Sequence, residues 1–437
     1  MIHSHYANHI AEIQKRWEGA MEAESISAIV IHSGSPMVSF LDDYVYPFRP
    51  NPHFLAWLPL THHHDSLLII RPGEQAELWY YQPEDYWHMP PSDPDSWWAD
   101  QFDVRVVTDP ASWKAAVRQL SGPLVALGDC SELQTAFATE AINPASLLMR
   151  LHLQRTRKTD YELACMRQAS GVAAAAHLAA RDAFLAGESE FDIHVAYLRS
   201  ARQNDAELPY NNIVAINEHA AVLHYQQRLR AVPAESRSFL IDAGATHYAY
   251  AADITRTYAA HSGEFSDLIA AMDTVELNLA GQVRAGLSYP ALHLQAHRQI
   301  AEVLRSAGII NLSAEDAVAS GLSSVFFPHG LGHFIGLQTH DVAGLVDNDG
   351  KDLLRPEGNP YLRLTRELEA GNVLTIEPGL YFIPSLLAEW KQNGDAGAVN
   401  WDAIARYLPY GGIRIEDNLV VTDSGGENLT RDAFAAI

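Results

Sequence analysis

The sequence predicts two domains, a smaller α/β domain followed by a larger α+β domain. A chain of 437 residues exceeds the size at which a single hydrophobic core normally continues to grow. Short apolar runs alternate with helical stretches as far as about residue 155, which is typical of α/β architecture. Beyond that point, long helical segments are combined with strand-like runs that contain acidic residues. We therefore expect domains over residues 1–155 and 156–437.

The first domain begins with an amphipathic helix, because Tyr6, Ile10, Ile13 and Trp17 recur at helical spacing. Short apolar segments bounded by Pro, Gly and Asp predict strands in SAIVIHSG, SLLIIRP, AELWYYQ, VRVVTD and PLVALGD. A helical stretch, ASWKAAVRQL, interrupts the strand series. This alternation predicts an α/β domain of about 150 residues, near the usual domain size.

The second domain opens with a long Ala-rich helix, for which Thr159 and Asp160 are suitable N-cap residues. Helical patterns predict helices at about 160–186, 189–205, 264–284 and 289–307. Asp242 and Asp253 bracket a turn predicted at Gly244-Ala245, so a hairpin would bring both carboxylates to one site. We expect antiparallel strands covered by helices, which is an α+β arrangement.

Composition argues against several classes of function. The formal charge of −24 argues against binding to nucleic acids or to anionic membranes. The two cysteines, Cys130 and Cys165, provide neither a disulfide framework nor a cysteine metal site. No apolar run reaches membrane-spanning length, and the N-terminal segment lacks the apolar core of a signal peptide. The expected location is therefore the cytoplasm, with no nucleic-acid or membrane partner.

Acidic residues inside apolar, strand-like runs are the strongest functional signal, and there are four: Asp242, Asp253, Glu377 and Glu416. Several buried carboxylates repel one another and are costly unless a cation compensates them. Two divalent ions would balance the four charges. His333, in PHGLGHFIGLQTHD, adds one imidazole, and such oxygen-rich ligation favours ions like Mn²⁺ over a thiolate-type zinc site. The residues predict a dinuclear metal enzyme that activates water.

Each of these residues alone could be an ordinary strand-end side chain, but their order forms a pattern. The motifs D-x10-D, H-G-x-G-H, I-E-P-G and G-G-x-R-x-E-D, in this order, resemble those of the metal-dependent pita-bread peptidases. Longer segments such as DAGATHYAYAADITRT and PYGGIRIEDNLVV resemble bacterial Xaa-Pro dipeptidases (prolidases), including the organophosphorus acid anhydrolases. The resemblance implies a pita-bread (creatinase/aminopeptidase-like) catalytic domain, preceded by a smaller α/β domain of the creatinase-like N-terminal type.

The resemblance also implies how five ligands divide between two divalent ions. Asp242 would bind one ion, whereas Asp253 and Glu416 would bridge both. His333 and Glu377 would complete the second ion's site. Mn²⁺ is the expected ion, with Co²⁺ or Zn²⁺ as alternatives. A water or hydroxide that bridges the ions would be the nucleophile, because metal coordination lowers the pKa of water toward about 7.

Three side chains would have catalytic roles by the same resemblance. Glu377 would carry a proton to the leaving nitrogen in addition to binding metal. His340, in LQTHD, resembles the histidine that supports the tetrahedral intermediate. His329 would orient groups around the metal site.

Substrate recognition requires contacts with the free carboxylate and the proline ring of a dipeptide. Arg414 and His224 resemble the pair that binds the carboxylate. Tyr210 and Tyr289 would line the prolyl pocket. Trp87 resembles an aromatic residue that reaches the neighbouring subunit's site in dimeric relatives, so a homodimer is expected.

The expected reaction is hydrolysis of Xaa-Pro dipeptides by a metal-bridged hydroxide, with release of C-terminal proline. One alternative is an aminopeptidase P-like exopeptidase that acts on longer Xaa-Pro peptides. Leu-Gln before Thr339-His340-Asp341 and the RIEDN context of Glu416 favour the dipeptidase. A metal-free creatinase-type hydrolase or binding module is a second alternative, which the intact ligand set opposes. Organophosphate triester hydrolysis is expected only as a promiscuous activity.

Other conspicuous residues receive ordinary interpretations. Adjacent side chains in His62-His63-His64 point in different directions in extended chain, so no metal site is predicted there. Trp97-Trp98 is expected to pack at a core or interface. Cys165 is expected to be a buried, inert thiol.

Overall fold

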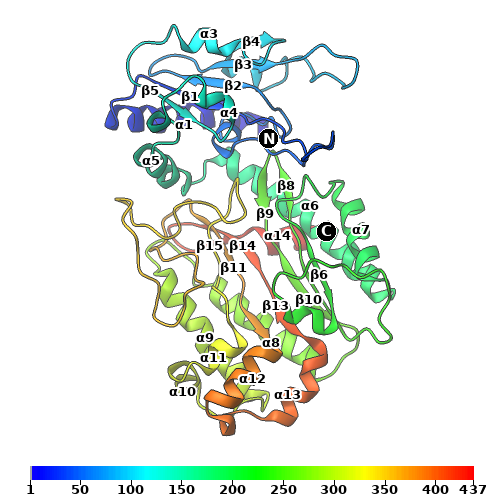
Figure 1. Cartoon of the computed structure of the whole chain (residues 1–437). Helices are drawn as coiled ribbons and strands as arrows, with labels where there is room; N and C mark the ends of the chain where they lie inside the picture. Colours follow the sequence, from blue (N-terminus) through cyan, green and yellow to red (C-terminus); the bar gives the residue numbers. More distant parts are fainter. Residues whose placement is uncertain (1) are drawn as a thin grey trace. The chain divides into compact units, whose positions relative to one another are not determined.

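The computed structural model describes residues 2–437, and the chain divides into two units (Figure 1). A mixed five-stranded sheet forms the centre of the first unit, Met1–Cys165. The strands are β1 (Ala28–His32), β2 (Leu67–Ile70), β3 (Glu77–Tyr81), β4 (Asp103–Val107) and β5 (Leu124–Leu127), in the order β4-β3-β2-β1-β5. The β1–β5 and β3–β4 pairs are parallel, and the other two pairs are antiparallel. Each strand lies in one of the segments predicted from apolar pattern, so these five predictions are confirmed.

Helices cover this sheet. Helix α1 (Ile2–Ala23) buries the predicted stripe of Tyr6, Ile10, Ile13 and Trp17. Val30 of β1 packs with Trp113 of α3 and Leu133 of α4, because alternate strand residues face the same side. The shorter helices of the unit are α2 (Pro52–Leu55), α3 (Trp113–Val117), α4 (Ser131–Gln134), α5 (Ala145–Arg155), η1 (Ala99–Gln101) and η2 (Thr139–Ala141).

The second unit, Met166–Ile437, contains the long helices that the sequence predicts. Its helices are α6 (Asp160–Leu185, which begins in the first unit), α7 (Glu190–Ala201), α8 (Glu264–Ala280), α9 (Tyr289–Ser306), α10 (Ala314–Ala319), α11 (Leu322–Phe326), α12 (Pro384–Asn393), α13 (Trp401–Tyr407) and α14 (Leu429–Ala435), with 3-10 turns η3 (Asn217–Ala221), η4 (Ala396–Ala398) and η5 (Leu408–Tyr410). None of the helices within residues 2–437 is both long and apolar enough to cross a membrane.

Thr159 caps α6, as the sequence predicts. The Glu162 carboxylate accepts from the Thr159 N–H at 2.7 Å, and the Thr159 hydroxyl accepts from the Glu162 N–H at 3.4 Å. This reciprocal pair is a capping box, which satisfies N–H groups that the first helical turn leaves without partners.

All strand pairs of the second unit are antiparallel, as expected for an α+β arrangement. The strands are β6 (Ile213–Ile216), β7 (Ser238–Asp242), β8 (Ala245–His247), β9 (Tyr250–Ala252), β10 (Thr255–Ala259), β11 (Val373–Ile376), β12 (Gly379–Tyr381), β13 (Gly412–Arg414), β14 (Asp417–Val421) and β15 (Gly426–Asn428). They form the sheets β10-β7-β6, β11-β14-β15, β12-β13 and β8-β9. The largest core packs α8, α9 and α11 against β11 and β14.

A hairpin connects Asp242 to Asp253, but the predicted position of its turn is wrong. Strands β8 and β9 pair, and the two residues between them, Tyr248 and Ala249, have φ of 49° and 69°. Two positive φ values match the twist of a two-residue hairpin. Gly244 is needed instead for close packing, since a Cβ there would lie 2.2 Å from the Ala252 carbonyl oxygen.

Candidate metal centre

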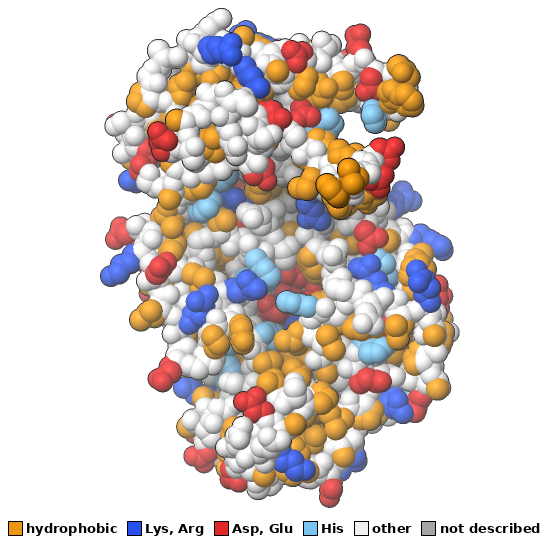
Figure 2. Space-filling view, in the orientation of Figure 1, with side chains coloured by type: hydrophobic (Ala, Val, Ile, Leu, Met, Phe, Trp, Pro, Cys, Tyr) orange, Lys and Arg blue, Asp and Glu red, His pale blue; other side chains and the backbone are white. Residues whose placement is uncertain are grey.

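Neighbouring strands of the second unit carry the acidic residues to one place. Thr255, at the start of β10, pairs with Asp242 of β7 and forms an isolated bridge with Glu416. Asp253 directly follows β9, two residues before Thr255. Paired strands lie only about 5 Å apart, so these carboxylates are close despite their separation in sequence. Figure 2 shows carboxylate and histidine side chains gathered in a hollow on one face of this unit.

The HGLGH segment lies beside β11 and places His333 next to Glu377. The Thr375 N–H donates to the His333 carbonyl at 2.9 Å, and the Glu377 N–H donates to the Leu331 carbonyl at 2.8 Å. A Cβ at Gly332 would lie 2.2 Å from the Thr375 carbonyl oxygen, so this close pairing requires glycine. In this register, His333 Nε2 lies 3.8 Å from Glu377 Oε1.

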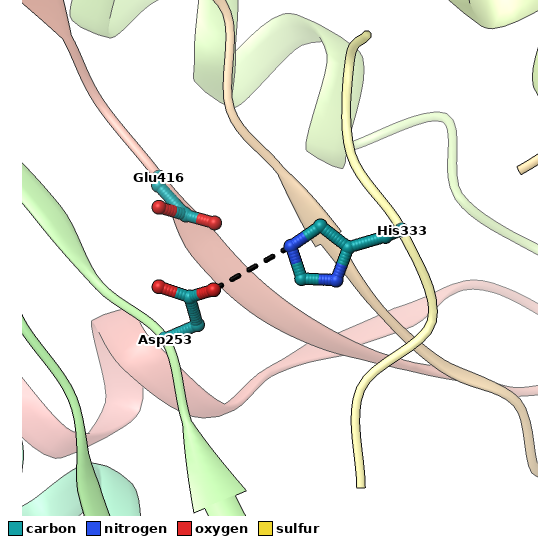
Figure 3. A group of neighbouring side chains, drawn as sticks. All are labelled: Asp253, His333 and Glu416. Carbon is teal, nitrogen blue, oxygen red and sulfur yellow. Dashed lines mark ion pairs between the residues drawn. The ribbon is translucent and has the colours of Figure 1, made fainter. Parts of the chain in front are cut away.

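Asp253, His333 and Glu416 form the tightest group (Figure 3). One potential ligand atom from each residue lies within 4.8 Å of the others, and no second group of three such residues occurs within residues 2–437. His333 Nε2 is 3.4 Å from Asp253 Oδ2, and Nδ1 lies 2.9 Å from the Phe334 carbonyl oxygen. The carbonyl fixes one proton on Nδ1, so Nε2 is the nitrogen that could exchange its contact with Asp253 for a cation.

Burial and mutual repulsion perturb the acidic groups. Burial raises the pKa of Asp242 and of Glu416, and it raises the pKa of Glu377 to about 7. Asp253 behaves differently: burial opposes its charge, but the hydrogen bond from His333 holds its pKa below the ordinary value. One imidazole therefore compensates Asp253, and Arg414 pairs with Asp242, but burial still disfavours the charged forms of Asp242, Glu377 and Glu416.

The donor set fits divalent cations. Asp242 Oδ1 is buried, and it has no hydrogen-bond partner among the residues that the structure describes. The Tyr210 hydroxyl donates to Asp253 instead of to this oxygen. Buried carboxylate oxygens with one imidazole nitrogen are ligands for hard or borderline divalent ions. A cation would supply the missing partner and remove the repulsion that raises the pKa of Asp242 and Glu416.

Arg414 is engaged by protein groups. Its Nη2 donates to Asp242 Oδ2 at 2.6 Å, Nη1 to the Tyr381 hydroxyl at 2.7 Å, and Nε to Thr255 Oγ1 at 3.3 Å. The residue is only 4% exposed. These contacts use three of the five N–H groups of the guanidinium. The structure therefore shows Arg414 holding Asp242, and its predicted contact with substrate stays a prediction.

Hydroxyl groups orient two further carboxylates. Thr255 Oγ1 donates to Glu416 Oε2 at 2.7 Å, and the Tyr210 hydroxyl donates to Asp253 Oδ1. Tyr210 was predicted to line the prolyl pocket, and the structure places its hydroxyl directly on a predicted ligand. Thr255 and Tyr381 were not predicted, because nothing in their own segments distinguishes them from ordinary strand residues.

His329 lies close to Glu377. Its Nε2 is 2.9 Å from the Tyr381 hydroxyl, its Nδ1 is 2.8 Å from the Gly330 carbonyl oxygen, and Nδ1 is 3.8 Å from Glu377 Oε2. Burial lowers the pKa of His329 to about 3, so the ring is neutral at neutral pH. This position is consistent with the predicted orienting role.

His340 lies at the rim of the site. Its ring meets the ring of His333 edge-on at a centroid distance of 4.4 Å. Partial burial and then the charges of His333 and Arg363 lower the pKa of His340 to about 4, with a smaller effect of His224. These electrostatic effects place an exposed arginine and a second histidine near His340. Arg363 was not predicted from sequence.

A buried carboxylate fixes the loop that carries His224. Glu190, at the start of α7, accepts hydrogen bonds from the N–H groups of Ile216 and Leu229 at 2.9 and 2.8 Å. It also bonds the Tyr225 hydroxyl and His219 Nδ1, both at 2.7 Å. These four contacts bind both ends of the loop of residues 217–229 to Glu190. Glu190 therefore fixes the position of the loop that carries the exposed His224.

Tyr289 and Trp87 are the remaining predicted substrate residues. Tyr289 is completely buried, and its hydroxyl donates to the Thr375 carbonyl at 2.8 Å. This hydrogen bond holds β11, and the predicted place of Tyr289 in the prolyl pocket stays a prediction. Trp87 belongs to the first unit and is 76% exposed. Its contact with a neighbouring subunit stays a prediction.

Comparison with known proteins follows the same division of the chain. A family model described as metallopeptidase family M24 matches residues 164–423. The chain belongs to metallopeptidase family M24. A second model, described as Xaa-Pro dipeptidase, N-terminal domain, matches residues 4–153 of this M24 member. Family membership and the buried Asp–His–Glu group together imply a divalent-metal centre.

Relatives of this M24 chain align along nearly its whole length. A protein named Xaa-Pro dipeptidase from Pseudoalteromonas atlantica is 47% identical over 98% of both chains. Another of that name, from Xanthomonas campestris pv. campestris strain B100, is 48% identical over 99% of this chain and 98% of its own. The resemblance predicted from sequence is thus confirmed.

Solved structures support the fold. The low-pH form of aminopeptidase P from E. coli superposes with a TM-score of 0.74 over 97% of this chain and 95% of its own, at 23% identity. At this identity the likeness supports the fold alone. The predicted α+β pita-bread domain, preceded by a smaller N-terminal domain, is confirmed by these matches together.

Proposed function

We propose that this chain hydrolyses Xaa-Pro dipeptides and releases C-terminal proline, with two divalent ions per chain, Mn²⁺ being the expected ion. The observation that carries the proposal is the buried group of Asp253, His333 and Glu416, in an M24 chain whose full-length relatives are named Xaa-Pro dipeptidase. Asp242, Asp253, His333, Glu377 and Glu416 would hold the ions.

When bound, the divalent ions would supply an acidified water and polarise the scissile carbonyl. The chain's own residues would do the rest. The nitrogen of the departing proline must gain a proton when the Xaa-Pro bond breaks. Glu377, 3.8 Å from both His333 and His329, would deliver that proton. His340, neutral at the rim, would donate a hydrogen bond to the carbonyl oxygen as it gains charge.

Recognition of the substrate carboxylate would fall to Arg363 together with His224. Arg363 is exposed, and its side chain makes no hydrogen bond or ion pair with other residues in the range 2–437. It lies close enough to His340 to lower the pKa of that ring. Arg414, by contrast, would hold Asp242. A guanidinium and a carboxylate form strong, directional hydrogen bonds, which suits recognition of a free C-terminus.

The test is proline release by metal-stripped protein reloaded with Mn²⁺ and offered Ala-Pro and Ala-Pro-Gly separately. We expect cleavage of Ala-Pro alone. Cleavage of Ala-Pro-Gly would move the assignment to the aminopeptidase P-like alternative, and inactivity on both would overturn the proposal. Three further expectations remain predictions with their own assays: a side reaction on organophosphate triesters, a homodimer contacted by Trp87, and a cytoplasmic location.

A further inference from the structure

The strand pairing that joins Asp253 to Glu416 ends within the metal centre. Thr255 and Glu416 form an antiparallel bridge, in which the Glu416 N–H donates to the Thr255 carbonyl at 3.0 Å. In a continued antiparallel ladder, Asp253 and Asn418 would pair two residues beyond the bridge. The Asn418 N–H instead donates to the Thr430 hydroxyl at 2.9 Å. The backbone pairing of the two strands therefore ends before Asp253.

The Asn418 side chain spans this gap. Its Oδ1 accepts from the Asp253 N–H at 2.9 Å, and its Nδ2 donates to the Asp253 carbonyl at 2.5 Å. Asn418 is completely buried. Only a carboxamide carries the donor and the acceptor that this arrangement needs, because a carboxylate cannot donate and a hydroxyl cannot reach both groups. The side chain thus replaces two backbone hydrogen bonds of the interrupted ladder.

Other groups already fix Glu416. Arg256 Nη1 donates to the Glu416 carbonyl at 2.8 Å, and its Nη2 donates to Asp417 Oδ1 at 2.7 Å. Arg431 Nε donates to the other Asp417 oxygen at 2.5 Å. These contacts anchor the start of β14. Among the described residues, Asn418 is what attaches the backbone of Asp253 to that strand.

We propose that Asn418 is a positioning residue that keeps Asp253 aligned with Glu416 for metal binding. The clamp holds the N–H and the C=O on both sides of the Asp253 Cα, so it sets the direction in which the carboxylate leaves the backbone. This inference rests on the proposed metal centre. Asn418 itself touches neither substrate nor ligand oxygen atoms.

The experiment compares Asn418→Ala, which removes both hydrogen bonds, with Asn418→Ser, which puts a single hydroxyl in place of the carboxamide. Calorimetry of the metal-stripped full chain would give the Mn²⁺ stoichiometry and Kd, and Tm would be measured with and without Mn²⁺. We expect Asn418→Ala to weaken Mn²⁺ binding by about 10- to 100-fold, the range for partners that orient metal ligands. We expect Asn418→Ser to lie between Asn418→Ala and wild type, and it carries the test if Asn418→Ala fails to fold.

Asn372→Ala is the matched control. Asn372 is equally buried at 1% exposure, and its Oδ1 accepts from the Glu369 N–H at 2.8 Å, away from the predicted ligands. It should lower Tm equally with and without Mn²⁺ and leave the Kd unchanged. Wild-type Mn²⁺ affinity in both Asn418 variants, or an equal loss of Tm in the two states, would overturn the inference. If wild-type protein bound no divalent ion, the proposed function would fail as well.

Discussion

Replacing Glu190 by glutamine should separate substrate recognition from metal binding. The carboxylate accepts four hydrogen bonds of 2.7–2.9 Å, two of them from backbone N–H groups that cannot reverse their role. A glutamine amide has one accepting oxygen, and its NH₂ must face either the Ile216 N–H or the Leu229 N–H. Either orientation leaves one of these N–H groups without an acceptor.

The cost can be worked from that geometry. A backbone N–H without its acceptor costs about 1–3 kcal/mol, which loosens the loop that carries His224. We expect a higher KM for Ala-Pro with a smaller change in kcat, and faster proteolytic cleavage within residues 217–229. The Mn²⁺ affinity should stay at the wild-type value, since Glu190 contacts none of the predicted ligands. Glu188→Gln, two residues earlier at an exposed position, is the control.

The reasoning would be refuted by an unchanged KM together with unchanged proteolysis of the loop. A loss of Mn²⁺ affinity equal to the rise in KM would also refute it, because the effect would then reach the metal centre. Glu188→Gln should match wild type in every measurement.

Three further predictions use the same assays. Arg363→Ala should raise KM for Ala-Pro by about 10- to 100-fold, as expected for one lost charge-assisted hydrogen bond. It should not alter any cleavage of Ala-Pro amide, which lacks the carboxylate. An equal loss of kcat/KM on both substrates would contradict a carboxylate contact. Arg414→Lys should weaken Mn²⁺ binding, because one ammonium cannot replace contacts to Asp242, Tyr381 and Thr255; a change in KM alone would argue for direct substrate contact. Burial raises the pKa of Glu377 to about 7, so the folded wild-type protein loses stability as pH rises from about 4.5 to 7 and this carboxyl group must ionise. In metal-free protein, Glu377→Gln should therefore become progressively more stable than wild type over that window, by at most about 3 kcal/mol. A pH-independent difference in Tm would contradict this.

The fold could be predicted largely from local pattern. The five strands of the first unit and the long helices of the second follow from apolar runs, helical periodicity and the Thr159 cap, all of which lie within one segment each. The hairpin turn lies at Tyr248 and Ala249 and not at Gly244. The sequence did not predict this position, because neither of these two residues is a typical turn former whereas glycine is. Gly244 is required by the Ala252 carbonyl oxygen, a contact that sequence alone does not reveal.

The candidate site could be predicted only in part. Acidic residues in apolar strands can be recognised from sequence, because burial of charge is costly and calls for a compensating group. The structure brings Asp253, His333 and Glu416 together. No sequence pattern identifies the residues that orient these ligands. Asn418 and Thr255 contact partners more than 150 residues away, and a buried asparagine or threonine is unremarkable in its own segment. Tyr289 is a further case, since its hydroxyl donates to the Thr375 carbonyl of β11, a contact that the sequence does not reveal.

Proline release from Ala-Pro, followed as metal-stripped protein is titrated with Mn²⁺, tests the central claim most directly. The account predicts that activity rises with bound metal and saturates at two ions per chain, and that Asp253→Asn releases no proline at any Mn²⁺ concentration while retaining its fold. Proline release in the presence of excess chelator, or wild-type activity in Asp253→Asn, would contradict it.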